Sequence, residues 1–116
     1  MNYCEIKSLL FGMPPVDKLE FVMELGRGVS AVPIDGAVEI RGCASRVQIA
    51  RRGAGRFIAS ADSGIVRGII AVLLAMLESG IAPAEMMDEF NSLNLGLGTG
   101  RMNGLGAMIG YFQSVV

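Results

Sequence analysis

The stretch VEIRGCASRVQIARRGAGRFIAS, residues 38–60, carries the clearest structural signal in this chain, because it contains three short β-like runs. These runs are residues 38–40, 46–51 and 56–60. A glycine-containing turn joins the last two runs, which is the spacing of a β-hairpin. In the middle run Val47 and Ile49 alternate with Gln48, so we expect the two aliphatic side chains to face the core and Gln48 to face outward.

Helical patterns flank these strands on both sides. Asp17 can accept from the amide of Glu20, which predicts that the first long helix starts there. After the strands, Asp62 or Ser63 opens a helix that is apolar almost all round, so we expect it to be central and buried. The expected helices are residues 3–13, 17–25, from 62 or 63 to the stop at Gly80, 83–91, and from near Arg101 onward. This order predicts an α+β fold, and with no repeat or linker we expect a single domain over residues 1–116.

Composition excludes several classes of protein. Hydrophobic residues make up 52% of the chain, but the longest apolar run, residues 69–77, is far shorter than the roughly 20 residues of a spanning helix. The start of the chain lacks a basic stretch, a hydrophobic stretch and a cleavage site, so we expect a cytoplasmic protein that does not enter a membrane. Histidine is absent, which excludes Ser-His-Asp and Cys-His catalysis and leaves too few ligands for an ordinary zinc site.

Cys43 is the candidate functional residue, because it lies in a bend of small residues between two strand-like runs. Gly42 can take an unusual backbone angle, and the small side chains around it allow another molecule to approach the sulfur. Arg41 and Arg46 flank the bend, and nearby positive charge favours the thiolate form. The alternative is that Cys43 is an inert small hydrophobe in a turn.

Five of the eight arginines lie in residues 41–56, which makes this region locally basic. A basic cluster can bind nucleic acid, but only Phe57 is available there for base stacking, so we expect no nucleic-acid partner. Most of these charges are more simply explained as the solvated face of a small sheet.

Four motifs together resemble the SufE family of sulfur-acceptor proteins over residues 16–116. The motifs are ELG at residues 24–26, IRGCASRV at 40–47, ADS at 61–63 with IVRGIIAV at 65–72, and RMNGLGAMI at 101–109. The resemblance implies an α+β domain with a small curved antiparallel sheet of about three strands backed by helices. One departure is Gln48, which occupies the position of the family's usual tryptophan.

The resemblance also implies a function. In the family, the loop cysteine takes a sulfane sulfur from a pyridoxal-phosphate cysteine desulfurase, activates that enzyme and passes the sulfur on for iron-sulfur cluster assembly. Here that cysteine is Cys43, and the family's aspartate and arginine correspond to Asp62 and Arg101. We expect the partner to contact the rest of the loop, namely Arg41, Gly42, Ala44, Ser45 and Arg46.

The resemblance therefore predicts a persulfide carrier without a bound cofactor or metal, and not a free-standing enzyme. Its partners would be a SufS-like desulfurase and a downstream scaffold complex of the SufBCD type. Two alternatives stay open. An iron-sulfur or metal scaffold of the IscU type needs several converging ligands, and this chain offers Cys43 and a distant Cys4. A protein-binding module could also keep this fold without transferring sulfur.

Overall fold

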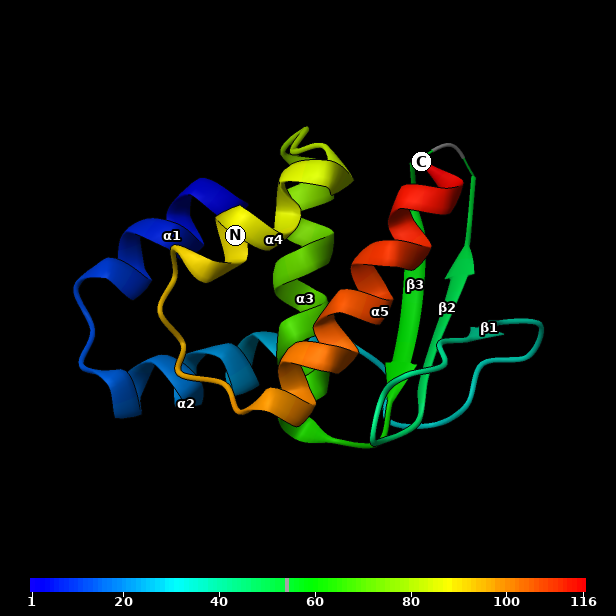
Figure 1. Ribbon diagram of the computed structural model, residues 1–116, viewed down its shortest axis with the longest axis horizontal. Helices are drawn as coiled ribbons and strands as arrows, with labels where there is room; N and C mark the ends of the chain where they lie inside the picture. Colours follow the sequence, from blue (N-terminus) through cyan, green and yellow to red (C-terminus); the bar gives the residue numbers. More distant parts are fainter. Residues whose placement is uncertain (54) are drawn as a thin grey trace.

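The computed structural model describes residues 1–53 and 55–116, and in these residues five α-helices and one short 3-10 helix accompany a three-stranded antiparallel sheet that lies at one end of the molecule (Figure 1). The elements are α1 (Tyr3–Phe11), α2 (Pro15–Leu25), η1 (Gly26–Gly28), β1 (Val38–Glu39), β2 (Val47–Arg51), β3 (Phe57–Ala61), α3 (Gly64–Glu78), α4 (Pro83–Asn91) and α5 (Thr99–Val115). The prediction of an α+β fold with a small curved sheet is confirmed.

The sheet has the order β1-β2-β3 and joins the strands that the sequence predicted. β2 and β3 pair along their full length, from Val47 opposite Ala61 to Arg51 opposite Phe57. Val47 and Ile49 are fully buried whereas Gln48 is partly exposed, as the alternation predicted. β1 ends at Glu39, one residue before the predicted end, although the amide of Ile40 still donates to the carbonyl oxygen of Val47 on β2. The hairpin turn includes Ala54, which lies outside the described residues.

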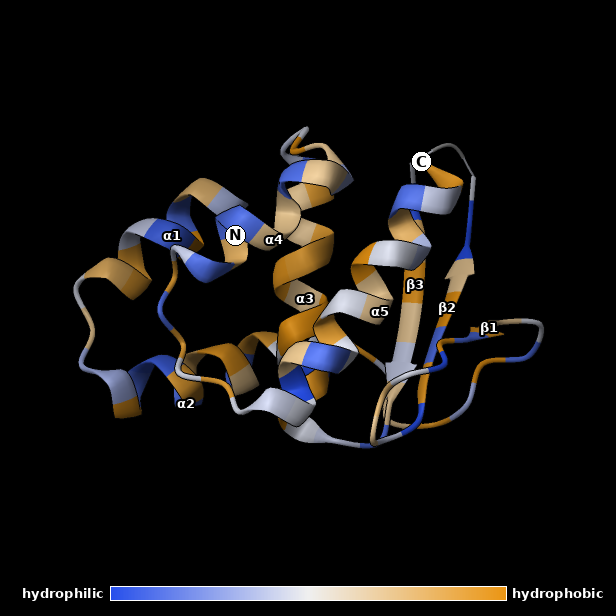
Figure 2. Ribbon diagram, in the orientation of Figure 1, coloured by the Kyte–Doolittle hydropathy of each residue, from blue (hydrophilic) through white to orange (hydrophobic). Residues whose placement is uncertain are grey.

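α3 is the central helix, with the sheet on one side and α1 and α2 on the other (Figure 1). Hydrophobic residues run along its whole length (Figure 2), and it supplies a large part of the core. α2 crosses α3 at very short distance, because Gly26 and Gly68 leave their backbones in direct contact: a Cβ at Gly68 would overlap the carbonyl group of Val22. The expected central, buried helix is therefore confirmed.

The start of α2 differs from prediction, whereas the start of α3 agrees with it. α2 begins at Pro15 and not at Asp17, because proline has the fixed φ angle that suits the first helical position. Asp17 then lies in the first turn, where its charge still stabilises the positive end of the helix. The N-cap of α3 is Ser63, which is one of the two residues predicted to open this helix, and neither α2 nor α3 has a side-chain hydrogen bond at its cap.

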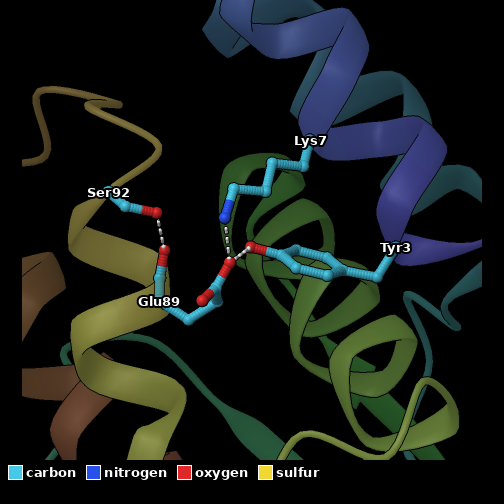
Figure 3. Close-up of polar contacts among 4 residues, drawn as sticks. All are labelled: Tyr3, Lys7, Glu89 and Ser92. Carbon is cyan, nitrogen blue, oxygen red and sulfur yellow. Dashed lines mark hydrogen bonds and ion pairs between the residues drawn. The ribbon is translucent and has the colours of Figure 1, made fainter.

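A polar cluster joins α1 to α4 (Figure 3). The Tyr3 hydroxyl and the Lys7 Nζ both donate to Glu89 Oε1, at 2.9 and 2.6 Å respectively. The hydrogen bond from Lys7, followed by that from Tyr3, lowers the pKa of the Glu89 carboxyl group, whereas burial and the nearby carboxylate raise the pKa of Tyr3. The cluster therefore connects α1 to α4, in addition to the buried apolar residues of α1.

Among the described helices, none has both the length and the apolar character that crossing a membrane requires.

Candidate functional site

The loop that carries Cys43 connects β1 to β2 and has a closed base. The amide of Ile40 donates to the carbonyl oxygen of Val47 at 2.9 Å, so the two ends of the loop are held side by side. Within the loop, Gly42 has a φ angle of +98°, the left-handed region that favours glycine, as predicted. A Cβ at Gly42 would also lie 3.3 Å from the Cβ of Ala107, so the loop packs closely on α5.

The Cys43 thiol points at α5 and is only partly exposed. Its Sγ donates to the carbonyl oxygen of Gly104 at 3.6 Å, and a Cβ at Gly104 would lie 3.4 Å from the sulfur. Burial raises the pKa of the Cys43 thiol. The expectation that Arg41 and Arg46 favour the thiolate is therefore wrong for this geometry, because the loss of hydration around the sulfur dominates.

Cys43 opens onto a cavity of about 310 Å³ formed by three segments of the chain, namely the loop, the N-terminal half of α3 with its cap, and α5. The lining residues are Cys43, Ala44, Ser45, Ser63, Val66, Ile69, Gly100, Arg101, Gly104 and Met108. Most of them are apolar or small, and Arg101 is the one charged side chain among these lining residues. The cavity therefore offers a mostly apolar space in which the sulfur could carry further atoms, with a cation at its edge.

The structure brings several of the predicted site residues together and leaves others apart. Arg101 lies in the first turn of α5, is exposed, and lines the cavity with Ala44 and Ser45. Asp62 is exposed and is not a lining residue, although its neighbour Ser63 is.

The remaining loop residues belong to a second surface. A depression of about 450 Å³ runs along the loop and is lined by residues 39–46, which include Arg41 and Gly42. Arg41 is exposed there. Arg46 also lines this depression, but its guanidinium group donates to Ser60 Oγ, Gln48 Oε1 and the carbonyl oxygen of Ala31. Arg41 is thus a solvent-facing charge, whereas Arg46 is hydrogen bonded within the fold.

Sequence reasoning missed the helix residues that form the cavity wall, chiefly Val66, Ile69 and Met108. Gly104 had a usable signal, because a glycine inside a helix needs compensation by close packing. Such packing is found at Gly104, where the sulfur of Cys43 lies beside the helix backbone, but not at Gly110, where nothing lies within 4 Å of an added Cβ.

The described residues contain no cluster of three or more Cys, Asp or Glu side chains that could hold a metal ion. Cys4 is exposed on α1, which lies well away from the loop between β1 and β2 (Figure 1). The chemistry available at this site is therefore that of a single thiol beside an apolar cavity.

Comparison with known proteins agrees with the predicted resemblance. The family model for SufE, described as an Fe-S metabolism associated domain, matches residues 6–116. An uncharacterized SufE-like protein of Rhizobium meliloti is 30% identical over 114 residues, which cover 84% of this chain and 81% of the relative. The sulfur acceptor protein CsdE of Escherichia coli is 33% identical over 106 residues, which cover 79% of this chain and 71% of the relative. The chain therefore belongs to the SufE family.

Proposed function

We propose that this protein is a sulfur acceptor for a cysteine desulfurase and that Cys43 carries the sulfur as a persulfide. The observation that carries the proposal is the half-buried Cys43 thiol, placed on a glycine-containing loop beside an apolar cavity of about 310 Å³. Family membership supports it, as does the similarity to a protein named as a sulfur acceptor. We further propose that no resident cofactor or metal takes part.

The proposed reaction is a thiolate exchange. The Cys43 thiolate attacks the outer sulfur of a cysteine persulfide on the donor, a new S–S bond forms at Cys43, and the S–S bond of the donor breaks. The donor cysteine leaves as a thiolate, and the outer sulfur, with its proton if it carries one, moves to Cys43. No electrons are gained or lost overall, so neither an oxidant nor a reductant is needed.

At rest, the thiol is poorly prepared for this attack. Its pKa is raised by burial, and its proton is directed at the carbonyl oxygen of Gly104. We propose that binding of the donor draws the loop outward and returns the sulfur to a more polar environment, where the thiolate forms more readily. The exposed guanidinium group of Arg101 is then available to stabilise the thiolate or to pair with a carboxylate on the donor.

After transfer, the loop can return and place the persulfide in the cavity. We propose that the protein increases the turnover of a SufS-like desulfurase by removing its persulfide, and that it delivers the sulfur to a scaffold complex of the SufBCD type in the cytoplasm.

The test is intact-protein mass spectrometry after incubation with a cysteine desulfurase and cysteine. We expect a gain of one sulfur atom, about 32 Da, that dithiothreitol reverses and that peptide mapping places on Cys43. Cys43→Ser should abolish the adduct, and Cys4→Ser is the matched control that should retain it. An adduct of the same size and yield in Cys43→Ser protein would refute the assignment.

A further inference from the structure

We propose that Arg46 is the positioning residue of the Cys43 loop. Its guanidinium group fixes the C-terminal end of the loop to two neighbouring segments, so that Cys43 moves on a rigid base and returns to one inward position. The relevance of this inference to sulfur transfer rests on the function proposed above. The geometry on which it stands is independent of that function.

The guanidinium group of Arg46 connects the sheet to the segment that precedes it. Nη1 donates to Ser60 Oγ on β3 at 2.8 Å and to Gln48 Oε1 on β2 at 3.2 Å. Nη2 donates to the carbonyl oxygen of Ala31 at 2.9 Å. The planar guanidinium group reaches these acceptors from two separate nitrogen atoms in a fixed geometry, whereas the ammonium group of lysine has its three donors on a single nitrogen.

The acceptors of Arg46 are themselves held in place. Ser60 is completely buried, and its hydroxyl donates to the carbonyl oxygen of Val32 at 2.6 Å. Gln48 Oε1 also accepts from the amide of Ile34 at 3.0 Å. Arg46 therefore belongs to a network that ties β2 and β3 to the segment of residues 31–34, which distinguishes it from the exposed arginines of the same sheet.

The loop itself is weakly held between its ends. In the described part of the chain, no backbone-to-backbone hydrogen bond joins residues 41–45 to another segment, and the side-chain bond from Cys43 to Gly104 comes from a thiol, which is a weak donor. The base, by contrast, has the bond between Ile40 and Val47 and, directly after the loop, the guanidinium network of Arg46. A loop that has few hydrogen bonds of its own, but whose two ends are firmly bonded, can move as a unit. The hydrogen bonds of Arg46 fix the C-terminal end of the moving segment.

The experiment measures how fast iodoacetamide alkylates Cys43 in the folded protein, across a range of pH, in a Cys4→Ser background so that Cys43 is the one thiol. We expect Arg46→Ala to raise the pH-independent rate about tenfold, because loss of a hydrogen-bonded charged donor loosens the base of the loop. Arg46→Lys should restore less than half of the difference, since one nitrogen replaces the two that reach Ser60 and Ala31. Arg52→Ala, which removes an exposed arginine at the far end of β2, should leave the rate unchanged.

Ser60→Ala separates positioning from stability, because it removes a buried hydroxyl but leaves Arg46 bonded to Ala31 and Gln48. The alkylation rate and the free energy of unfolding are measured for both variants. For each kcal/mol of stability lost, Arg46→Ala should accelerate alkylation more than Ser60→Ala does. Equal acceleration in the two variants, or an unchanged rate in Arg46→Ala, would overturn the proposal.

A parallel assay of sulfur transfer from a cysteine desulfurase should show a lower maximal rate for Arg46→Ala with little change in KM. Failure of wild-type Cys43 to take up sulfur would refute the proposed function, while the alkylation rates would still decide the role of Arg46.

Discussion

Replacing Gly104 with alanine tests whether the close approach of α5 to the sulfur matters for function. The added methyl group would lie 3.4 Å from Cys43 Sγ and 3.7 Å from the Cα and Cβ of Cys43, which is van der Waals contact without overlap. The substitution also removes a glycine from the interior of a helix, which is worth up to about 1 kcal/mol. The folded protein should therefore tolerate the change or become slightly more stable.

The same methyl group takes up space that a persulfide on Cys43 would need. We expect Gly104→Ala to slow sulfur uptake and to speed the loss of sulfur from the loaded protein, without lowering the thermal midpoint. Gly110→Ala is the matched control in the same helix, because nothing lies within 4 Å of its added Cβ. It should raise the thermal midpoint by about 4 °C for up to about 1 kcal/mol of stabilisation, and leave sulfur uptake unchanged.

The two variants gain similar helix propensity, so the difference between them isolates the contact with the sulfur. Thermal unfolding and mass spectrometry of the persulfide, performed on both, provide the comparison. Equal rates of sulfur uptake in Gly104→Ala and Gly110→Ala would refute the reasoning that the space beside the sulfur serves the persulfide.

Three further outcomes follow from the described contacts. Gly68→Ala should destabilise the protein by at least about 2 kcal/mol in chemical denaturation, because the added carbon overlaps the backbone of α2; an intact unfolding midpoint would contradict the close crossing. The pKa of the Glu89 carboxyl group is lowered in the folded protein, so its contribution to stability is present above the unfolded pKa of about 4.3 and is lost as the pH falls through the folded pKa. Glu89→Gln should therefore flatten the acid side of the curve of unfolding free energy against pH, measured from pH 3 to 7. Arg101→Ala should slow sulfur transfer while leaving the thermal midpoint nearly unchanged, since exposed charges contribute within about 1 kcal/mol, and normal transfer by this variant would remove Arg101 from the site.

Local sequence signals predicted the elements well where the physical cause is local. Pro83 sets the start of α4 at the predicted residue, and alternation along residues 47–49 gives the buried face of β2. Prediction failed at the start of α2, where two adjacent prolines and an N-terminal aspartate gave competing signals and Pro15 took the first helical position. The Asn2 and Glu5 capping box of α1 was also missed, although its residue types and spacing are typical.

The candidate site was only partly predictable, because its cavity depends on contacts between distant segments. Cys43 stood out through its small neighbours, but the cavity wall needs Val66 and Met108 from two different helices. Arg41 and Arg46 look equivalent in the sequence, since both flank the cysteine. Their difference comes from Ser60, which lies 14 residues away along the chain and reaches Arg46 through the hairpin register.

The half-buried position of Cys43 has a kinetic consequence for the proposed carrier. We expect a persulfide held against α5 to react with small thiols such as glutathione only after the loop moves outward. At high glutathione concentration, the rate of sulfur loss should therefore stop rising and reach a plateau equal to the opening rate of the loop. The lifetime of the persulfide would then depend on the protein fold and not on the concentration of thiols in the surrounding solution. A bound acceptor that holds the loop open would determine when the sulfur is released.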